Sequence, residues 1–261
     1  MEVDISSGAP AVIVASQFDQ QAPIGGQLLR VDAATGGLIF DRIYTPSVPT
    51  EVNDVSFADV ARKPGADYYV TGSVTRLING EIFDTDLFVA RLNATTGAVV
   101  WAKAIGTPLD PERGYGYETG RGIELASDGS VVVVGQINHP VETFGPDGAV
   151  HIRFDAANGA ILAQSTLLDV QVAAASLDRL SNGQMVASGT RSFGDGQGFP
   201  HMWRLDSATL LVDWRREYNT TTSFGHDAVE SVNPTQGLVL VGNHFSNNAI
   251  GFPDQMFIRT D

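Results

Sequence analysis

One short pattern returns five times along this chain, and its spacing restricts the possible folds more than any other feature. It is an apolar stretch that carries an arginine and is followed, in four copies, by an Asp or Asn and a tight turn. The arginines are Arg30, Arg91, Arg153, Arg204 and Arg259, separated by 61, 62, 51 and 55 residues. Self-similarity at such a period is typical of repeat architectures, in which each copy is one supersecondary unit.

A second landmark lies upstream of each arginine and keeps step with it. It is a short run rich in β-branched residues that ends in a small residue. The small residues are Ser16, Gly72, Gly135, Gly189 and Gly242, separated by 56, 63, 54 and 53 residues. Because two independent landmarks share one period, the repeat covers nearly the whole chain.

The third repeat predicts the secondary structure of the unit. Four short apolar runs, at 122–127, 131–137, 149–155 and 160–166, are separated by turns rich in Gly, Asn and Asp, as expected for four antiparallel strands. Four-stranded units at this period predict a propeller. The expected fold is all-β, a single domain over 1–261 with five blades, at about 2–50, 51–115, 116–170, 171–222 and 223–261. The last blade is expected to lack its fourth strand.

Two kinds of repeated side chain are expected to hold the blades together. Trp101 and Trp214 follow the turns of the second and fourth repeats and are expected to pack between blades. The repeated arginine is expected to pair with a carboxylate or to cover the neighbouring blade. The strand, the Arg-apolar-Asp turn and the following Trp together resemble the repeats of quinoprotein-like and bacterial secreted-type β-propellers. That resemblance implies blades, while a quinone cofactor is not expected and no other cofactor is predicted.

Composition excludes several functional classes. The chain of 261 residues has a formal net charge of −14, so it lacks the basic surface that nucleic acid requires. It has no cysteine, which excludes thiolate chemistry and Cys-ligated zinc. No apolar run is long enough to span a membrane, and no signal peptide is recognisable at the first residues.

The expected loops are of two kinds, and the longer kind marks the face predicted to bind. Connections between strands two and three, and from blade to blade, are long, and both open on the same face. Long loops are commonly retained for function, so we expect binding on that face. The candidate binding residues are Arg113, Tyr115, Tyr117, His139, His226, His244 and Phe252.

The central channel offers a different interpretation. The first strand of each blade is expected to line it, with Asp54, Arg121, His226 and Asp227 near its entrance. Carboxylates facing each other across a funnel can act as acid and base in glycoside cleavage. Solvated or ion-paired channel residues are the alternative, and no glycosidase motif is present at these positions.

Metal binding has only weak candidates. Asp84, Asp86 and Asp195 offer oxygen ligands suited to calcium, but none belongs to a complete Asp-rich calcium loop. The five histidines lack the spacing of a zinc site.

The sequence therefore predicts a binding or scaffolding module without enzymatic activity, engaged in protein–protein interaction in an extracytoplasmic, periplasmic or surface assembly. The alternative is a carbohydrate-active enzyme, a glycoside hydrolase or lyase, that uses the channel carboxylates. A protein partner, a second copy or a further segment is expected at the edge of the last blade. A water-solvated edge is the other possibility.

Overall fold

A computed structural model of the chain describes residues 2–4, 11–18, 25–45, 52–62, 67–78, 82–106, 116–138, 148–167, 172–193, 197–218, 223–231, 237–244 and 254–260. Every regular element in these ranges is a β-strand. None of the ranges contains a helix long and apolar enough to cross a membrane.

The strands form five successive groups. The first holds β1 (Glu2–Asp4), β2 (Ala11–Phe18), β3 (Gly25–Asp32) and β4 (Leu38–Tyr44). The second holds β5 (Val52–Arg62), β6 (Tyr68–Ile78), β7 (Ile82–Leu92) and β8 (Val99–Ile105). The third holds β9 (Tyr117–Leu125), β10 (Val131–Asn138), β11 (Gly148–Phe154) and β12 (Ile161–Leu167). The fourth holds β13 (Val172–Arg179), β14 (Met185–Phe193), β15 (Gln197–Leu205) and β16 (Val212–Glu217). The fifth holds β17 (Ser223–Glu230), β18 (Leu238–His244) and β19 (Asp254–Arg259).

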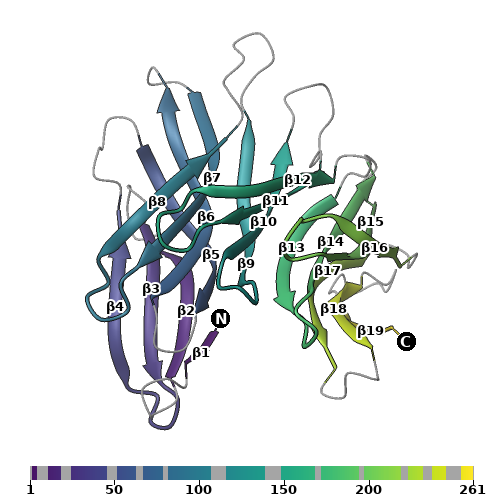
Figure 1. Ribbon diagram of the computed structural model, residues 1–261, viewed down its shortest axis with the longest axis horizontal. Helices are drawn as coiled ribbons and strands as arrows, with labels where there is room; N and C mark the ends of the chain where they lie inside the picture. The colour runs from purple at the N-terminus through teal and green to yellow at the C-terminus, as the bar shows by residue number, and fades with distance from the viewer. Residues whose placement is uncertain are drawn as a thin grey trace.

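Each group is an antiparallel meander, in which a strand pairs with the next one along the chain. The first four meanders have four strands, and the fifth has three among the described residues. One parallel pair, Thr85 with Tyr117, joins β7 to β9 and merges the second and third meanders into an eight-stranded sheet. Figure 1 shows the meanders in chain order, with the first and the last on opposite sides of the view. In the second meander the connection between the second and third strands was expected to be long, but β6 extends to Ile78 and β7 begins at Ile82.

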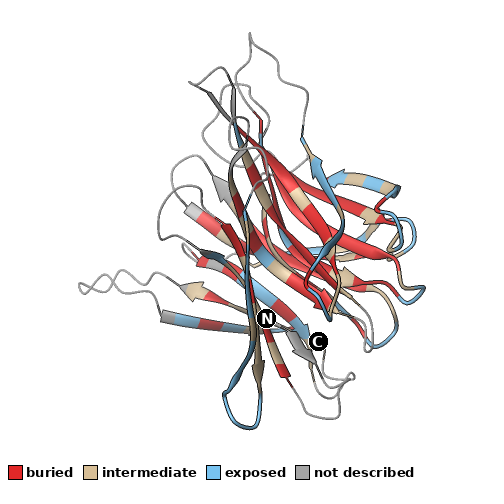
Figure 2. Cartoon of the chain, turned by 90° about the vertical axis from the view of Figure 1, so that its left-hand side faces the viewer, coloured by how far each residue is buried: buried red, intermediate tan, exposed pale blue. Residues whose placement is uncertain are grey.

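The core lies between neighbouring meanders, and β10 shows how. Its four successive valines, 131–134, are all fully buried. The even-numbered pair packs in one cluster with Trp203 of the fourth meander, and the odd-numbered pair in another with Val89 of the second. A continuous apolar run is therefore needed, because both faces of the strand are covered. Figure 2 shows buried residues along such inner strands, and the last strands β4, β8 and β12 are mostly exposed.

The small residue of the second landmark has a steric cause. The first strands of the second to fifth meanders each contain a β-bulge, which places Ala58, Arg121, Ala175 and His226 outside the regular pairing. The bulge brings a backbone carbonyl against the second strand. A Cβ added at Gly72, Gly135 or Gly189 would lie 1.9, 2.4 or 2.1 Å from that oxygen. Only glycine fits such a close backbone approach.

The turns between third and fourth strands are built alike. Asp32 accepts hydrogen bonds through Oδ1 from the backbone N–H groups of Ala34 and Thr35. Asn93, Asp155 and Asp206 do the same in the next three meanders. An Asp or Asn side chain that bonds its own backbone in this way favours a turn, which explains why the pattern recurs after each arginine.

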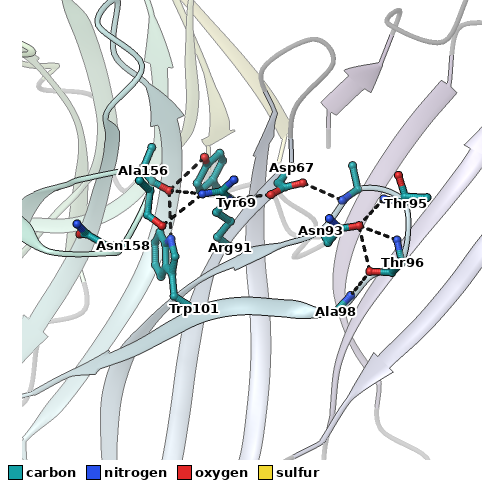
Figure 3. Close-up of polar contacts among 12 residues, drawn as sticks. Asp67, Tyr69, Arg91, Asn93, Thr95, Thr96, Ala98, Trp101, Ala156 and Asn158 are labelled. Atoms are coloured by element: carbon teal, nitrogen blue, oxygen red, sulfur yellow. Dashed lines mark hydrogen bonds and ion pairs between the residues drawn. The ribbon is translucent and has the colours of Figure 1, made fainter.

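These turns dock on the preceding meander. Trp101 of β8 donates from Nε1 to the carbonyl oxygen of Ala156 at 3.1 Å, and Arg91 of β7 donates from Nη1 to the same oxygen at 3.2 Å (Figure 3). Arg91 also pairs through Nε with Asp67 at 2.8 Å. At the next interface, Arg153 donates from Nη1 to Ala208 O at 2.7 Å. The repeated arginine thus does both things expected of it: it pairs with a carboxylate and contacts the neighbouring meander.

The fifth meander differs because nothing covers its outer face in the described residues. Phe257 is 67% exposed, while Leu28, Val89, His151 and Met202, which also lie two residues before the repeated arginine, are fully or almost fully buried. Consecutive meanders pack against each other along the series, but no comparable packing joins the fifth to the first among the described strands.

Candidate functional site

The first strands of four consecutive meanders each carry a carboxylate near their end. These residues are Asp59, Glu124, Asp178 and Asp227, and each accepts a hydrogen bond from the backbone N–H of the residue that follows it, at 2.7 to 2.9 Å. Asp59 also accepts one from the N–H of Ile123 on β9, at 3.1 Å. Because these first strands pack against one another, their carboxylates lie in one region. We call these four residues the channel acids.

Burial raises the pKa of three of the channel acids. The main cause for Asp59, Glu124 and Asp178 is loss of hydration, which disfavours the charged form. The charges of other channel acids add to it. Asp227 raises the pKa of both Asp59 and Asp178, although it lies on the fifth meander. Backbone hydrogen bonds oppose the rise. The channel acids are thus electrostatically coupled across several meanders.

A polar groove of about 240 Å³ opens between the second and third meanders. One side is formed by Asp54, Ser56 and Ala58 of β5, and the other by Tyr117, Thr119, Gly120 and Arg121 of β9. Gln17 of β2 and Gly72, Ser73 and Thr75 of β6 complete it. Tyr117 is 42% exposed, so its ring is available for stacking. The groove combines a carboxylate, a guanidinium, hydroxyl groups and an aromatic ring, which suits a polar ligand.

The structure brings together some of the residues predicted for the channel. Asp54 and Arg121 line the same groove. His226 and Asp227 lie on β17 of the fifth meander and are not part of that lining. Arg121 and His226 occupy equivalent bulges in their first strands, and both are exposed. Bulges often re-aim side chains beside functional sites.

Much of the predicted binding face lies outside the described residues. Of its candidates only Tyr117 and His226 are described with their side chains. His244 ends β18, but its side chain is outside the description. Arg113, Tyr115, His139 and Phe252, and the calcium candidate Asp195, lie outside the described residues. That face therefore stays a prediction.

The other two calcium candidates are engaged in an ion-pair cluster. Asp84 and Asp86 project from β7 and are each 1% exposed. Arg76 of the neighbouring strand β6 bonds to both, with 3.2 Å between its Nη2 and Asp84 Oδ2. Burial raises the pKa of Asp86, Arg76 lowers it and Asp84 raises it further. No group of three or more metal-ligating side chains occurs within the described ranges.

Sequence reasoning missed Asp59, Glu124 and Asp178. A signal was present, because each is an acid that directly follows an apolar residue late in a first strand, in FADVA, GIELA and SLDRL. The exact bulge that sets its direction is not visible in the pattern.

Comparison with known proteins gives the fold and no family. No protein-family model matches the sequence, and no curated protein is significantly similar to it. Solved structures do match. An ulvan lyase of polysaccharide lyase family 25, bound to a GlcA–Rha3S saccharide, has a TM-score of 0.59 at 9% identity, with 98% of this chain and 63% of the lyase covered.

Two further structures are similar over most of the chain. A luciferin-regenerating enzyme has a TM-score of 0.50 at 10% identity, covering 100% of this chain and 76% of the enzyme. The Dos1 propeller has a TM-score of 0.47 at 14% identity, covering 84% of this chain and 49% of its own. The lyase is a β-propeller protein, so this chain resembles a propeller in fold. At these identities the likeness extends to the fold alone.

Proposed function

We propose that this chain is a non-enzymatic binding module that engages a protein partner through the free edge of β19, in an extracytoplasmic or surface assembly. One observation carries the proposal: β19 pairs only with β18 within the described residues, whereas every other third strand pairs on both sides. An edge with unpaired N–H and C=O groups is a template for an added strand. Backbone hydrogen bonds supply affinity in this mode, and side-chain pockets supply specificity.

A strand peptide tests this proposal. The probe is a labelled peptide with the sequence of residues 160–167, which serves as fourth strand in the third meander. The expected result is saturable binding to the full chain in fluorescence anisotropy, with no binding of a scrambled peptide. Equal signals from both peptides would contradict the proposal.

We also propose that the five meanders are the blades of one ring, with the fifth packed on the first. Val12, Val14 and Leu29 of the first meander are only half-buried, although residues at the same register in the third meander are fully buried. Phe257 is the exposed counterpart at the other end. If the ring closes in solution, Phe257→Glu lowers the free energy of unfolding by about 1–3 kcal/mol, since a charge is then desolvated. An unchanged free energy of unfolding argues for an open arrangement.

A second candidate function is that of a carbohydrate-active enzyme, and the polar groove favours it. Tyr117 could stack on a sugar ring, Arg121 could bind an acidic group, and Asp54 could act as acid or base. On this alternative the chain releases reducing ends from a polysaccharide, and Asp54→Asn abolishes the release. Failure of the intact chain to cleave a panel of neutral and uronate-containing polysaccharides would count against the enzyme.

A further inference from the structure

Three successive interfaces are closed in the same way, by the turn that joins the third and fourth strands of the following meander. Tyr44 of β4 donates to Gly97 O at 3.0 Å, Trp101 of β8 to Ala156 O at 3.1 Å, and Ser165 of β12 to Leu210 O at 2.7 Å. In each case the donor sits on the fourth strand of one meander, and the acceptor is a backbone carbonyl of the next meander's turn. Each of these hydrogen bonds goes to the backbone of the turn and requires the turn to lie close to the donor.

At the fourth interface the described residues include the donors and no such turn. Trp214 and Arg204 hold the positions of Trp101 and Arg91, and both line an open cavity of about 270 Å³ together with Leu238 and Thr260 of the fifth meander. Arg204 bonds to Asp213 through Nε and Nη2, at 3.0 and 3.1 Å. Within the described residues, Nε1 of Trp214 and Nη1 of Arg204 make no hydrogen bond, whereas the equivalent atoms of Trp101 and Arg91 both bond to Ala156 O.

The sequence of β19, the third strand of the fifth meander, follows the repeat up to this cavity. Arg259, Thr260 and Asp261 correspond in sequence to Arg153, Phe154 and Asp155, which precede the turn that occupies the second interface. Thr260 closes the fifth hairpin by exchanging hydrogen bonds with Leu238. The cavity therefore lies where a turn would continue from β19, and a fourth strand entering beside β19 would begin there.

We propose that this cavity is a socket for a partner polypeptide that supplies a tight turn followed by a β-strand. The turn carbonyls accept from Trp214 Nε1 and Arg204 Nη1, and the strand pairs with β19. The inference rests on the proposed function and deepens it, because it adds a sequence requirement to strand addition: a small, Gly-containing turn before an apolar strand. The three occupied interfaces argue for this occupant, since each holds such a turn on the same kind of donor.

Two peptides distinguish binding in the socket from strand addition at the edge of β19. The first has the sequence of residues 156–167, turn and strand, and the second that of residues 160–167, the strand alone. Added to the full chain, the longer peptide is expected to bind about ten-fold more tightly, from two additional hydrogen bonds. Equal affinities would overturn the socket and leave the edge proposal standing. Binding of neither peptide would overturn both.

Trp214→Phe and Trp101→Phe form a matched pair of variants. Trp214→Phe keeps an aromatic ring and removes Nε1, so it should weaken the longer peptide about five-fold and leave the shorter one unchanged. At the interface of Trp101 the turn is already in place. Trp101→Phe should therefore lower the denaturation midpoint without changing the affinity for either peptide. Equal weakening by both variants would contradict the socket. So would a stable dimer of the chain that the longer peptide does not dissociate, since a second copy would then be the occupant.

Discussion

Leu210 is the only non-glycine residue with a positive φ among the described residues, at 60°. It stands in the turn position that Gly36, Gly97 and Gly159 hold in the first three meanders, with φ near 70°. The left-handed region costs an ordinary residue about 1–2 kcal/mol. Leu210 is fully buried in the core between the third and fourth meanders, so its side chain offsets the strain of its backbone.

This balance predicts an inverted ranking of two substitutions. Leu210→Ala loses the buried side chain and keeps the strain, and should lower the free energy of unfolding by about 3 kcal/mol. Leu210→Gly loses the same side chain but relieves the strain, and should be about 1 kcal/mol more stable than Leu210→Ala. Urea denaturation checks the order. A Gly variant less stable than the Ala variant would contradict the strained turn.

His151 predicts a pH dependence at the same interface. It is fully buried, accepts a hydrogen bond at Nε2 from Trp203 Nε1 at 2.8 Å, and contacts Ser165 Oγ through Nδ1 at 3.0 Å. Burial lowers the pKa of His151 to about 4. The unfolded chain therefore binds more protons between that pKa and the ordinary value of 6.5, and stability is lost as the pH falls through this window.

The size of the loss follows from the shift. From pH 7 to pH 4.5, His151 should remove roughly 2–3 kcal/mol from the free energy of unfolding. His151→Gln should lack this component, so the difference between the two pH profiles isolates it from other titrating groups. Parallel profiles for the two proteins would show that the histidine charges freely in the folded state.

At the scale of the element, the bulged first strand explains the glycine that ends the landmark run in the second, third and fourth meanders. The bulge presses Ala173 O toward Gly189, and a Cβ there would lie 2.1 Å from that oxygen. In the first meander the equivalent residue is Ser16, and among the described residues β1 pairs with residues 11–13 and not with Ser16. The position tolerates a side chain wherever the first strand does not reach it.

Gly189→Ala is therefore predicted to lower the free energy of unfolding by about 2–3 kcal/mol, because the strands must separate to admit the methyl group. Ser16→Ala is the matched control at the equivalent position and should change stability by less than about 1 kcal/mol, the worth of its hydrogen bond to Gln27. Chemical denaturation of both variants gives the comparison. A mild effect of Gly189→Ala would mean that the bulge can flatten.

The elements were predictable from sequence because their signals are local. The four-valine run of β10 and the Asp-containing turn after Arg153 each specify their own conformation, and both lie where the repeat places them. Asp54 and Arg121 were expected near one another and share a groove. Asp227 was predicted for the channel, but Asp59, Glu124 and Asp178 were not, because each follows a bulge in its first strand and period-two reasoning does not locate a bulge.

At the scale of the whole molecule, the channel acids couple four meanders. Glu124 is largely buried, and its pKa is raised by burial first and then by the charges of Asp178 and Asp59. A raised pKa in the folded state means that its charge opposes folding once the pH exceeds that pKa. The protonated form of Glu124 thus contributes to the free energy of unfolding at low pH, and this contribution is lost as the pH rises through its pKa in the folded state.

Glu124→Gln should therefore stabilise the chain at pH 7, because it removes a charge that burial and the neighbouring acids disfavour. The gain should shrink as the pH falls toward the ordinary pKa of a glutamate. The amide retains an oxygen for the N–H of Leu125, which Glu124 accepts at 2.7 Å. A variant less stable than the parent at pH 7 would show that the charge is compensated in the native channel.

Within the described residues β19 pairs only with β18, and hydrogen exchange over residues 254–260 tests most directly whether its outer edge is free. In the isolated chain, the β19 amides that do not bond to β18 should exchange much faster than amides of the equivalent strand β11, which is paired on both sides. Adding the peptide of residues 156–167 should slow these amides at least about ten-fold and leave β18 unchanged. Uniform protection of β19 in the isolated chain, or no change when the peptide binds, would contradict the claim.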